Sequence, residues 1–376
     1  MHFLAERMNH IDASGIRKIF ALAAKIKNPI NLSIGQPDYD VDTEVKEVAI
    51  QSIRSGFNSY TQTWGIEELR DGVGAYYHEK FGVVPSNVMI TSGVSGGLYL
   101  SLLATVNPGD EVLFADPYFV MYPHLVRLLG GTPVPINTYP QDGTSVKDAF
   151  KLRPEAIEAA ITKNSKILIV NAPSNPTGVT LNHEELKAIA AVAKKHNLLV
   201  ITDEIYESLQ YDESPSTMVG MYDNVILLNG FSKNVGMTGW RVGYAAGPDA
   251  IIQAMNTLQQ YTFVCAPSFA QKAAVIALKA DMREKLDNYR RKRDLAYDML
   301  RSFTEVTKPG GAFYIFPKAP GNDGDTFVPR AIENKVLIIP GSVFSNHKTH
   351  MRISFAAPDD TIRAGIEVLQ RLADST

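Results

Sequence analysis

"KILIVNAPSNPTGVTLNHEELKAIAAVAKKHNLLVIT", residues 166–202, contains the pattern that decides the fold. Two short apolar runs, 166–170 and 198–202, flank a segment with the periodicity of a helix (182–196), for which Asn182 is a plausible N-cap. Both runs are bounded by turn residues and rich in β-branched residues, which is typical of strands buried on both faces. A strand, a helix and a second strand in this order predict one unit of a parallel sheet.

Four further apolar runs of the same kind lie before and after this unit. They occupy residues 87–91, 111–115, 224–228 and 242–246. A helical pattern over 95–106 lies between the first two runs and ends at an Asn-Pro-Gly stop signal. Alternation of strands and helices on this scale predicts an α/β fold with a mostly parallel sheet.

The C-terminal part has a different order of elements. A long, charged helix pattern covers 282–303, and a last helix begins near Asp360. Three apolar runs lie between these helices, at 310–317, 335–341 and 350–356. Strands followed by a helix predict a smaller α+β unit.

Three parts are therefore expected along the chain. Residues 1–40 form an N-terminal segment that packs with a small domain, residues 282–376, and residues 41–281 form the large domain that contains the mostly parallel sheet. Residues 317–326 are rich in proline and glycine and are expected to form a surface loop.

The composition narrows the classes of protein to consider. The chain has 376 residues, a net charge of −3 and no basic run, so nucleic-acid binding is not indicated. No apolar run is long enough to cross a bilayer, and the N-terminus lacks the apolar core of a signal peptide. The single cysteine, Cys265, excludes an internal disulfide and fits a reducing compartment. These features predict a globular, cytoplasmic protein.

Polar residues directly follow five of the predicted strands. Ligands of open parallel sheets bind beyond the carboxyl ends of the strands, so we expect these residues to meet at one site. Residues 92–97 supply an anion-binding turn, and residues 116–119 supply an aromatic ring. An amide, a carboxylate and an amine come from residues 171–178, 203–206 and 229–233, respectively.

Two of these groups have specific electrostatic requirements. The turn 92–97, Ser-Gly-Val-Ser-Gly-Gly, opens a helix, where free backbone N–H groups and the positive helix end favour a phosphate. Asp203 ends an apolar strand, so its charge needs a cationic partner or hydrogen bonds. The alternative role of Asp203 is to cap the following turn. Tyr206 lies one turn beyond Asp203 and can face the same site.

Lys233 is the residue that distinguishes between possible functions. It lies in "NGFSKNVGMTGWRVGY", residues 229–244, among small and apolar residues and near Arg241. Desolvation and a nearby cation lower the pKa of an amine, which then becomes nucleophilic and forms Schiff bases. A phosphate-binding turn, a buried acid and a reactive lysine together are what pyridoxal phosphate requires.

The sequence resembles the class I and II aminotransferases, which are pyridoxal-phosphate enzymes of fold type I. The resemblance covers nearly the whole chain in the order typical of the family. The matching stretches are "SIGQPDYDV" (33–41), "SYTQTWGIEELR" (59–70), "NAPSNPTG" (171–178), "VITDEIY" (200–206), "GFSKNVGMTGWRVGY" (230–244) and "MRISFA" (351–356).

The resemblance implies a role for each cofactor-binding position. Lys233 corresponds to the lysine that forms the internal aldimine, a Schiff base with pyridoxal 5'-phosphate, and that shuttles the substrate proton. Asp203 corresponds to the partner of the pyridinium, and Asn175 and Tyr206 to hydrogen-bond partners of the phenolic oxygen. The remaining implied contacts are to the phosphate, from Val94, Ser95, Ser232, Arg241 and Tyr60 of the partner subunit, and to the face of the ring, from Phe119.

The resemblance also implies how a substrate binds. Arg352 corresponds to the residue that clamps the α-carboxylate, with Asn175 and the backbone at Gly35 as further partners. No second basic residue is evident for a side-chain carboxylate, and Ile16 is apolar in the segment expected to line the pocket. Neutral or aromatic amino acids are therefore favoured over aspartate.

The implied activity is transfer of an amino group from an L-amino acid to a 2-oxo acid by a ping-pong mechanism, in a homodimer. The main alternative is a pyridoxal-phosphate-dependent β-lyase of the carbon–sulfur type, because such enzymes share the lysine, aspartate and arginine. A remote alternative is a serine hydrolase, since residues 93–97 match G-x-S-x-G around Ser95, with His347 or His350 as the base. No metal site is expected, because these histidines lack nearby carboxylates at ligand spacing.

Overall fold

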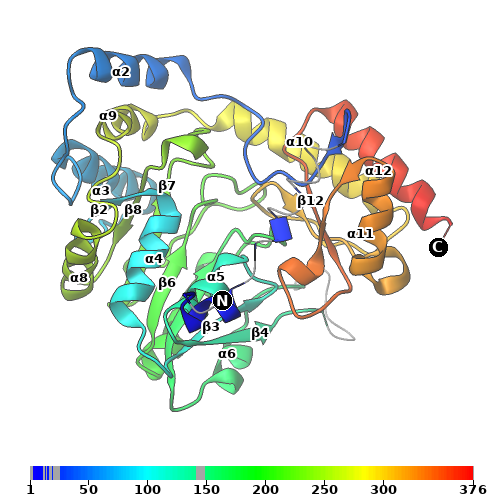
Figure 1. Ribbon diagram of the computed structural model, residues 1–376, viewed down its shortest axis with the longest axis horizontal. Coiled ribbons are helices and arrows are strands. Elements are labelled where there is room, and N and C mark those ends of the chain that lie inside the picture. The colour runs from blue at the N-terminus through cyan, green and yellow to red at the C-terminus, as the bar shows by residue number, and fades with distance from the viewer. Residues whose placement is uncertain are drawn as a thin grey trace.

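A seven-stranded sheet forms the centre of the molecule in the computed structural model, which describes residues 3–11, 13, 15, 16, 19, 26–140 and 149–375 (Figure 1). Its strand order is β2-β8-β7-β6-β5-β3-β4. All neighbouring strands are parallel except at β8, which runs antiparallel to both β2 and β7. The predicted α/β fold with a mostly parallel sheet is therefore confirmed. The strands are β2 (Met89–Thr91), β3 (Glu111–Asp116), β4 (Thr132–Asn137), β5 (Ser165–Asn171), β6 (Leu199–Asp203), β7 (Val225–Gly230) and β8 (Gly243–Ala246).

Helices cover both faces of this sheet, because alternate residues of each central strand are apolar and point in opposite directions. In β5, Ile167 and Ile169 pack on one face with residues of α4, α5 and α8, whereas Leu168 and Val170 pack on the other face with α6 and α7. Residues of α2, α3 and α9 pack on the second face as well, against β7 and β8. These helices are α2 (Thr43–Arg54), α3 (Glu67–Phe81), α4 (Gly93–Thr105), α5 (Met121–Leu128), α6 (Pro154–Ala160), α7 (His183–Lys195), α8 (Asp249–Gln260) and α9 (Ser268–Ala277). Asn182 caps α7 with a full capping box, as the sequence predicts.

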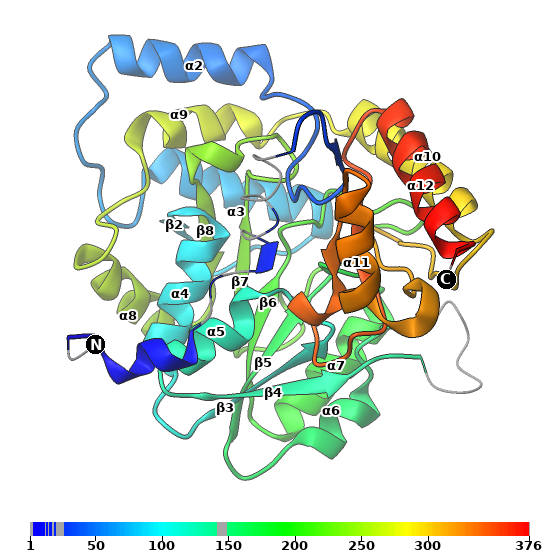
Figure 2. The same ribbon diagram turned by 45° about the vertical axis from the view of Figure 1, so that its right-hand side comes forward.

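A second, smaller group of elements comes from the C-terminal part of the chain. Three antiparallel strands in the order β11-β12-β9 lie against α10, α11 and α12, and α10 lies beside α12 in both views (Figures 1 and 2). The short β1 (Ile30–Asn31) pairs with β10 (Val336–Leu337), which ties the N-terminal segment to this group. The other elements are β9 (Tyr314–Ile315), β11 (Ile339–Pro340), β12 (Met351–Ser354), α10 (Arg283–Leu300), α11 (Gly324–Glu333) and α12 (Asp359–Ala373).

Two local features differ from the sequence-based expectation. The strand β4 was not predicted, because Pro133 and Pro135 lack the backbone N–H groups that pair strands. The two prolines are tolerated because β4 lies at the edge of the sheet. Residues 317–326 are not a plain surface loop. They contain a 3₁₀ turn at Pro320–Asn322 and the start of α11, where the Asp323 carboxylate accepts hydrogen bonds from two backbone N–H groups.

In the part of the chain that the structure describes, no helix is both long enough and apolar enough to cross a membrane.

Candidate active site

A cavity of about 620 Å³ lies at the carboxyl ends of the parallel strands. Strands β5, β6 and β7 and the turns after them deliver polar residues to it, and the segment after β3 delivers Phe119, Val120 and Met121. The start of α4, the strand β12 and residues 34–36 also line it. Of the residues assigned from the sequence to the cofactor or the substrate, Tyr60 alone does not line the cavity; this residue is 84% exposed. Those that line it are Ile16, Gly35, Val94, Ser95, Phe119, Asn175, Asp203, Tyr206, Ser232, Lys233, Arg241 and Arg352.

Lys233 presents its amine to this cavity from the turn that follows β7. Its Nζ donates a hydrogen bond to the Gly35 carbonyl oxygen at 2.6 Å. Burial, together with the nearby cations Arg352 and Arg241, lowers the pKa of the Lys233 amine to about 8. Near neutral pH the amine is therefore unprotonated far more often than that of an ordinary lysine, and the unprotonated form is the one that attacks a carbonyl carbon.

Asp203 provides a buried carboxylate at the end of β6. The Tyr122 hydroxyl donates a hydrogen bond to Asp203 Oδ2 at 2.7 Å, and the Asn171 side-chain amide donates to the Asp203 carbonyl oxygen at 2.9 Å. Burial raises the pKa of the Asp203 carboxyl to about 6. No lysine or arginine of the described residues forms an ion pair with this carboxylate, although the Lys233 amine acts on it electrostatically, so it is suited to pair with a protonated ring nitrogen of a ligand.

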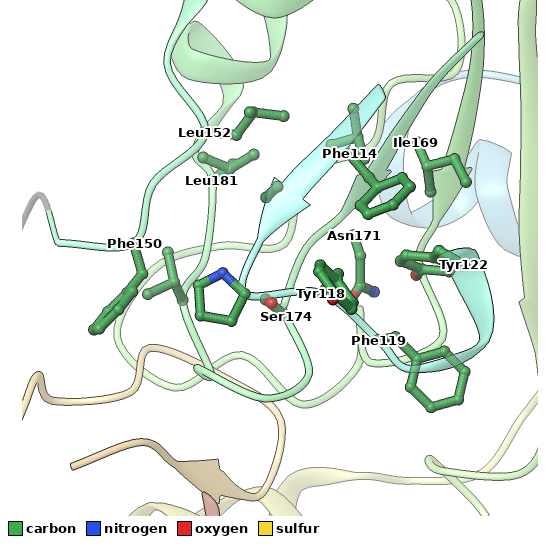
Figure 3. A pocket seen from close by; sticks show the side chains of 14 residues that line it. Phe114, Tyr118, Phe119, Tyr122, Phe150, Leu152, Ile169, Asn171, Ser174 and Leu181 are labelled. Carbon is green, nitrogen blue, oxygen red and sulfur yellow. The ribbon is translucent and has the colours of Figure 1, made fainter. Parts of the chain in front are cut away.

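Phe119 and Tyr122 lie next to each other at the beginning of α5, and Asn171 extends from β5 beside them (Figure 3). The rings of Phe119 and Tyr122 meet edge to face with centroids 5.7 Å apart. The three residues also line a small inner cavity of about 30 Å³, which has room for about one water molecule. Phe119 lines both this small cavity and the larger one. Its contact with Tyr122 therefore fixes a ring that also faces the larger cavity.

The start of α4 forms an anion-binding turn. The N-cap residue, Ser92, makes no side-chain hydrogen bond to the first turn, so the N–H groups of that turn are available to a ligand. Gly93 has a φ of +67°, and a Cβ at this position would lie 2.6 Å from the Arg241 guanidinium. Only glycine leaves room for Arg241 beside the helix end. A cation next to a helix N-terminus fits the phosphate group of pyridoxal phosphate.

Arg352 is a buried cation with unused hydrogen-bonding capacity. It donates from Nη1 to Asn175 Oδ1 at 3.0 Å and from Nη2 to the Ser33 carbonyl oxygen at 2.8 Å. Its Nε is buried without a hydrogen-bond partner among the described residues. The guanidinium also lies over the rings of Tyr314 and Phe344, at 4.4 and 4.7 Å from their centroids. A buried guanidinium with a free N–H is suited to bind a carboxylate of a substrate.

The residues needed for a serine-hydrolase triad do not assemble around Ser95. His350 stacks on Phe316 with ring centroids 5.2 Å apart, and its Nδ1 is hydrogen-bonded to the Thr349 hydroxyl. His347 packs against Tyr139. Among the described residues, no group of three or more His, Cys, Asp or Glu side chains could hold a metal ion.

Sequence reasoning missed two tyrosines of this site. Tyr122, which is hydrogen-bonded to Asp203, lies three residues after Phe119, and this helical spacing could have indicated it. Tyr314 lines the cavity and is hydrogen-bonded to Tyr206, but only the pairing of β9 with β12 brings it there. No local sequence signal indicates Tyr314.

Comparisons with known proteins agree with this chemistry. A family model described as aminotransferase class I and II matches residues 27–369. A Bacillus subtilis protein described as a probable N-acetyl-LL-diaminopimelate aminotransferase is 38% identical over 98% of this chain and 95% of its own length. Aromatic-amino-acid aminotransferase 2 of Thermococcus litoralis is 34% identical over 98% of each chain. The structure of Thermus thermophilus aspartate aminotransferase with maleate superimposes with a TM-score of 0.93 at 31% identity, covering 99% of this chain and 100% of that one.

Proposed function

The chain belongs to the class I and II aminotransferase family and is a pyridoxal-phosphate-dependent transferase, and on this basis we propose that it moves an amino group from an L-amino acid to a 2-oxo acid through Lys233. The observation that carries the proposal is the placement of the Lys233 amine in one cavity with the Asp203 carboxylate and the open N-terminus of α4. When bound, pyridoxal phosphate withdraws electrons from the substrate α-carbon and so makes its proton removable.

The described residues offer a partner for each part of this cofactor. The amides of Val94 and Ser95 at the start of α4, with Ser232 and Arg241, would hold the phosphate. Asp203 would pair with the protonated ring nitrogen and Phe119 would pack on the ring. The Asn175 amide oxygen already accepts from Arg352, so its NH₂ group is left to donate to the phenolic oxygen, together with Tyr206.

Lys233 then has two tasks that follow from its surroundings. Its amine, with a pKa of about 8, would hold the cofactor covalently and, when released, would take the proton from the substrate α-carbon. Arg352 orients the substrate by binding its carboxylate with the free Nε–H. The same residues act in reverse when a 2-oxo acid enters, which gives a ping-pong reaction.

A substrate with an uncharged side chain fits the described lining best. The cavity residues left after these assignments include the apolar Ile16, Ile34, Val120 and Met121. Within the described residues, every lysine and arginine of the lining already has a role at the cofactor or the α-carboxylate. The names of the similar proteins do not decide the matter, because they specify an acetylated diamino acid, aromatic amino acids and aspartate.

A panel of amino acids assayed with 2-oxoglutarate tests both the reaction and the substrate class. We expect parallel double-reciprocal plots and a kcat/KM at least about tenfold higher for leucine or phenylalanine than for aspartate, since an unpaired carboxylate in an apolar pocket costs more than about 1.4 kcal/mol. Intersecting plots would contradict the ping-pong reaction. A preference for aspartate would contradict the proposed class of substrate but not the proposed reaction.

We propose that the active unit is a homodimer in which Tyr60 serves the partner subunit's site. Its ring is 84% exposed, and Tyr261 is 83% exposed. Their two loops are adjacent, because Gln271 Nε2 donates to Thr61 Oγ1 at 3.0 Å and Gln259 Nε2 donates to the Thr63 carbonyl oxygen at 2.7 Å. Exposed aromatic rings on adjacent loops are typical of an interface between subunits.

Heterodimers with two affinity tags test the origin of Tyr60. When one chain carries Lys233→Ala and the other Tyr60→Ala, one site of the dimer keeps both residues if Tyr60 acts across the interface. We expect about half of the wild-type activity from this dimer at limiting cofactor, where loss of a phosphate hydrogen bond weakens cofactor binding about tenfold. The control dimer, with both changes in one chain and a wild-type partner, should be the less active of the two. The opposite order would show that Tyr60 serves its own subunit.

We further propose that the chain divides functionally at the predicted positions. Residues 41–281 would hold the cofactor, and residues 282–376 would close on the substrate together with the segment around β1. The start of the predicted segment 1–40 differs, because Glu6–His10 contacts α5 of the large part. The pairing of β1 with β10 supports this grouping, as does the packing of Leu32 in one apolar cluster with residues of α10 and α12.

A further inference from the structure

Tyr314 connects two parts of the active site. It lies on β9 and pairs with Ser354 of β12. Arg352 lies on β12 two residues before Ser354, so the side chains of Tyr314 and Arg352 are close to each other. The Tyr314 hydroxyl lies 3.1 Å from the Tyr206 hydroxyl, and the Tyr314 ring lies under the Arg352 guanidinium at 4.4 Å. Both tyrosines are buried, at 1% and 4% exposure, so water does not compete freely for this hydrogen bond.

The direction of this hydrogen bond depends on what the cavity holds. Each hydroxyl has one proton, and either oxygen can be the donor. If Tyr206 donates its proton to an anionic oxygen in the cavity, its own oxygen is free to accept, and Tyr314 is the group placed to donate. A hydroxyl that accepts a hydrogen bond becomes a stronger donor, because hydrogen bonds in a chain polarise one another.

The position of the Tyr314 hydroxyl is restricted by its surroundings. A Cβ at Gly35 would lie 2.8 Å from this oxygen, so the backbone that passes over the cavity closes one side of it. The Arg352 guanidinium and the edge-to-face contact with Tyr206, with ring centroids 5.9 Å apart, restrict the ring itself. The hydroxyl therefore has little freedom to turn to another partner.

We propose that Tyr314 is a positioning residue that donates a hydrogen bond to Tyr206 and so strengthens the bond from Tyr206 to the phenolic oxygen of the bound cofactor. This inference rests on the proposed function, because it needs the cofactor in the cavity. Tyr314 does not touch the reacting atoms; it acts through Tyr206.

The visible absorbance of the bound cofactor reports on this hydrogen bond, because a stronger donor stabilises the ionised phenolic oxygen and lowers the pH at which the spectrum changes. In Tyr314→Phe holoenzyme we expect the spectrophotometric pKa to rise by about 0.5 units, and in Tyr206→Phe by about one unit or more. In the Tyr206→Phe background, the added Tyr314→Phe change should have no effect. An equal shift in both backgrounds, or none in either, would overturn the inference.

Tyr211→Phe is a matched control. Tyr211 belongs to the same apolar cluster and its buried hydroxyl donates to the Ala312 carbonyl oxygen, but it does not line the cavity. Its loss should leave the spectrophotometric pKa unchanged, and a shift equal to that of Tyr314→Phe would mean that any loss of a buried hydroxyl produces the effect. Phenylalanine at position 314 keeps a ring under Arg352, so the KM for the amino acid should change by less than about twofold.

Failure of the proposed function would look different from failure of this inference. A wild-type protein that binds no cofactor, or that gives no spectral change with any amino acid, would contradict the proposed aminotransferase reaction. An active wild-type enzyme whose spectrum titrates identically to that of Tyr314→Phe would overturn the role of Tyr314 alone.

Discussion

Replacing Lys233 by alanine is expected to lower kcat by about 10⁴-fold or more while the protein still binds pyridoxal phosphate. The amine is the group placed to hold the cofactor covalently and to move the α-proton, and positioned proton-transfer groups alone contribute up to about 10⁴-fold. The helix end at α4, Arg241 and Asp203 remain to hold the cofactor by non-covalent contacts. The measurements are kcat under saturating substrates and the cofactor content of the purified variant.

Lys233→Arg is the matched control for charge. It keeps a cation at this position but has no nucleophilic amine, so it should be as inactive as Lys233→Ala. A small primary amine added to the buffer should restore part of the proton transfer in Lys233→Ala, where it has space, and not in Lys233→Arg. Turnover of Lys233→Ala near the wild-type value would rule out the assigned role.

Replacing Asp203 by asparagine is expected to lower kcat/KM by about 10²–10³-fold. Position 203 is buried, and asparagine has nearly the same shape as aspartate. Asparagine lacks the negative charge, however, that would keep the ring nitrogen of the cofactor protonated. Breaking a buried ion pair by removing one partner costs about 3–5 kcal/mol. Stopped-flow measurement of the first half-reaction gives the loss directly, separate from product release.

Asp203→Glu separates charge from shape. It keeps the carboxylate but adds a methylene at a position that is 4% exposed, so we expect partial activity between that of the asparagine variant and that of the wild type. If asparagine supported the half-reaction within about threefold of the wild-type rate, the ion pair with the ring nitrogen would not contribute to the reaction as argued.

The elements that position the site could be predicted because each depends on local sequence. Asp203 ends one apolar, β-branched strand and Lys233 lies in the turn after the next strand, and the parallel arrangement of these strands brings their carboxyl ends together. The anion-binding turn at the start of α4 could be recognised because a run of serine and glycine, residues 92–97, opens an apolar helix.

The parts that could not be predicted depend on pairing between distant residues. Tyr314 reaches the cavity because β9 pairs with β12, and nothing near position 314 in the sequence specifies that pairing. The strand β4 was missed for a different reason: Pro133 and Pro135 are unfavourable for a strand in general and acceptable only at the edge of a sheet, and the sequence does not give the order of the strands.

A single-turnover experiment with the holoenzyme tests the central claim most directly. The enzyme is mixed with an excess of leucine or phenylalanine, without a 2-oxo acid, and the 2-oxo acid and ammonia formed are counted against the concentration of subunits. The proposed aminotransferase forms about one equivalent of 2-oxo acid per subunit, releases no ammonia, and resumes only when a second 2-oxo acid is added. Cysteine and its thioethers are tested in the same way. Continued formation of pyruvate and ammonia from these amino acids without an acceptor would contradict the account and identify a β-lyase.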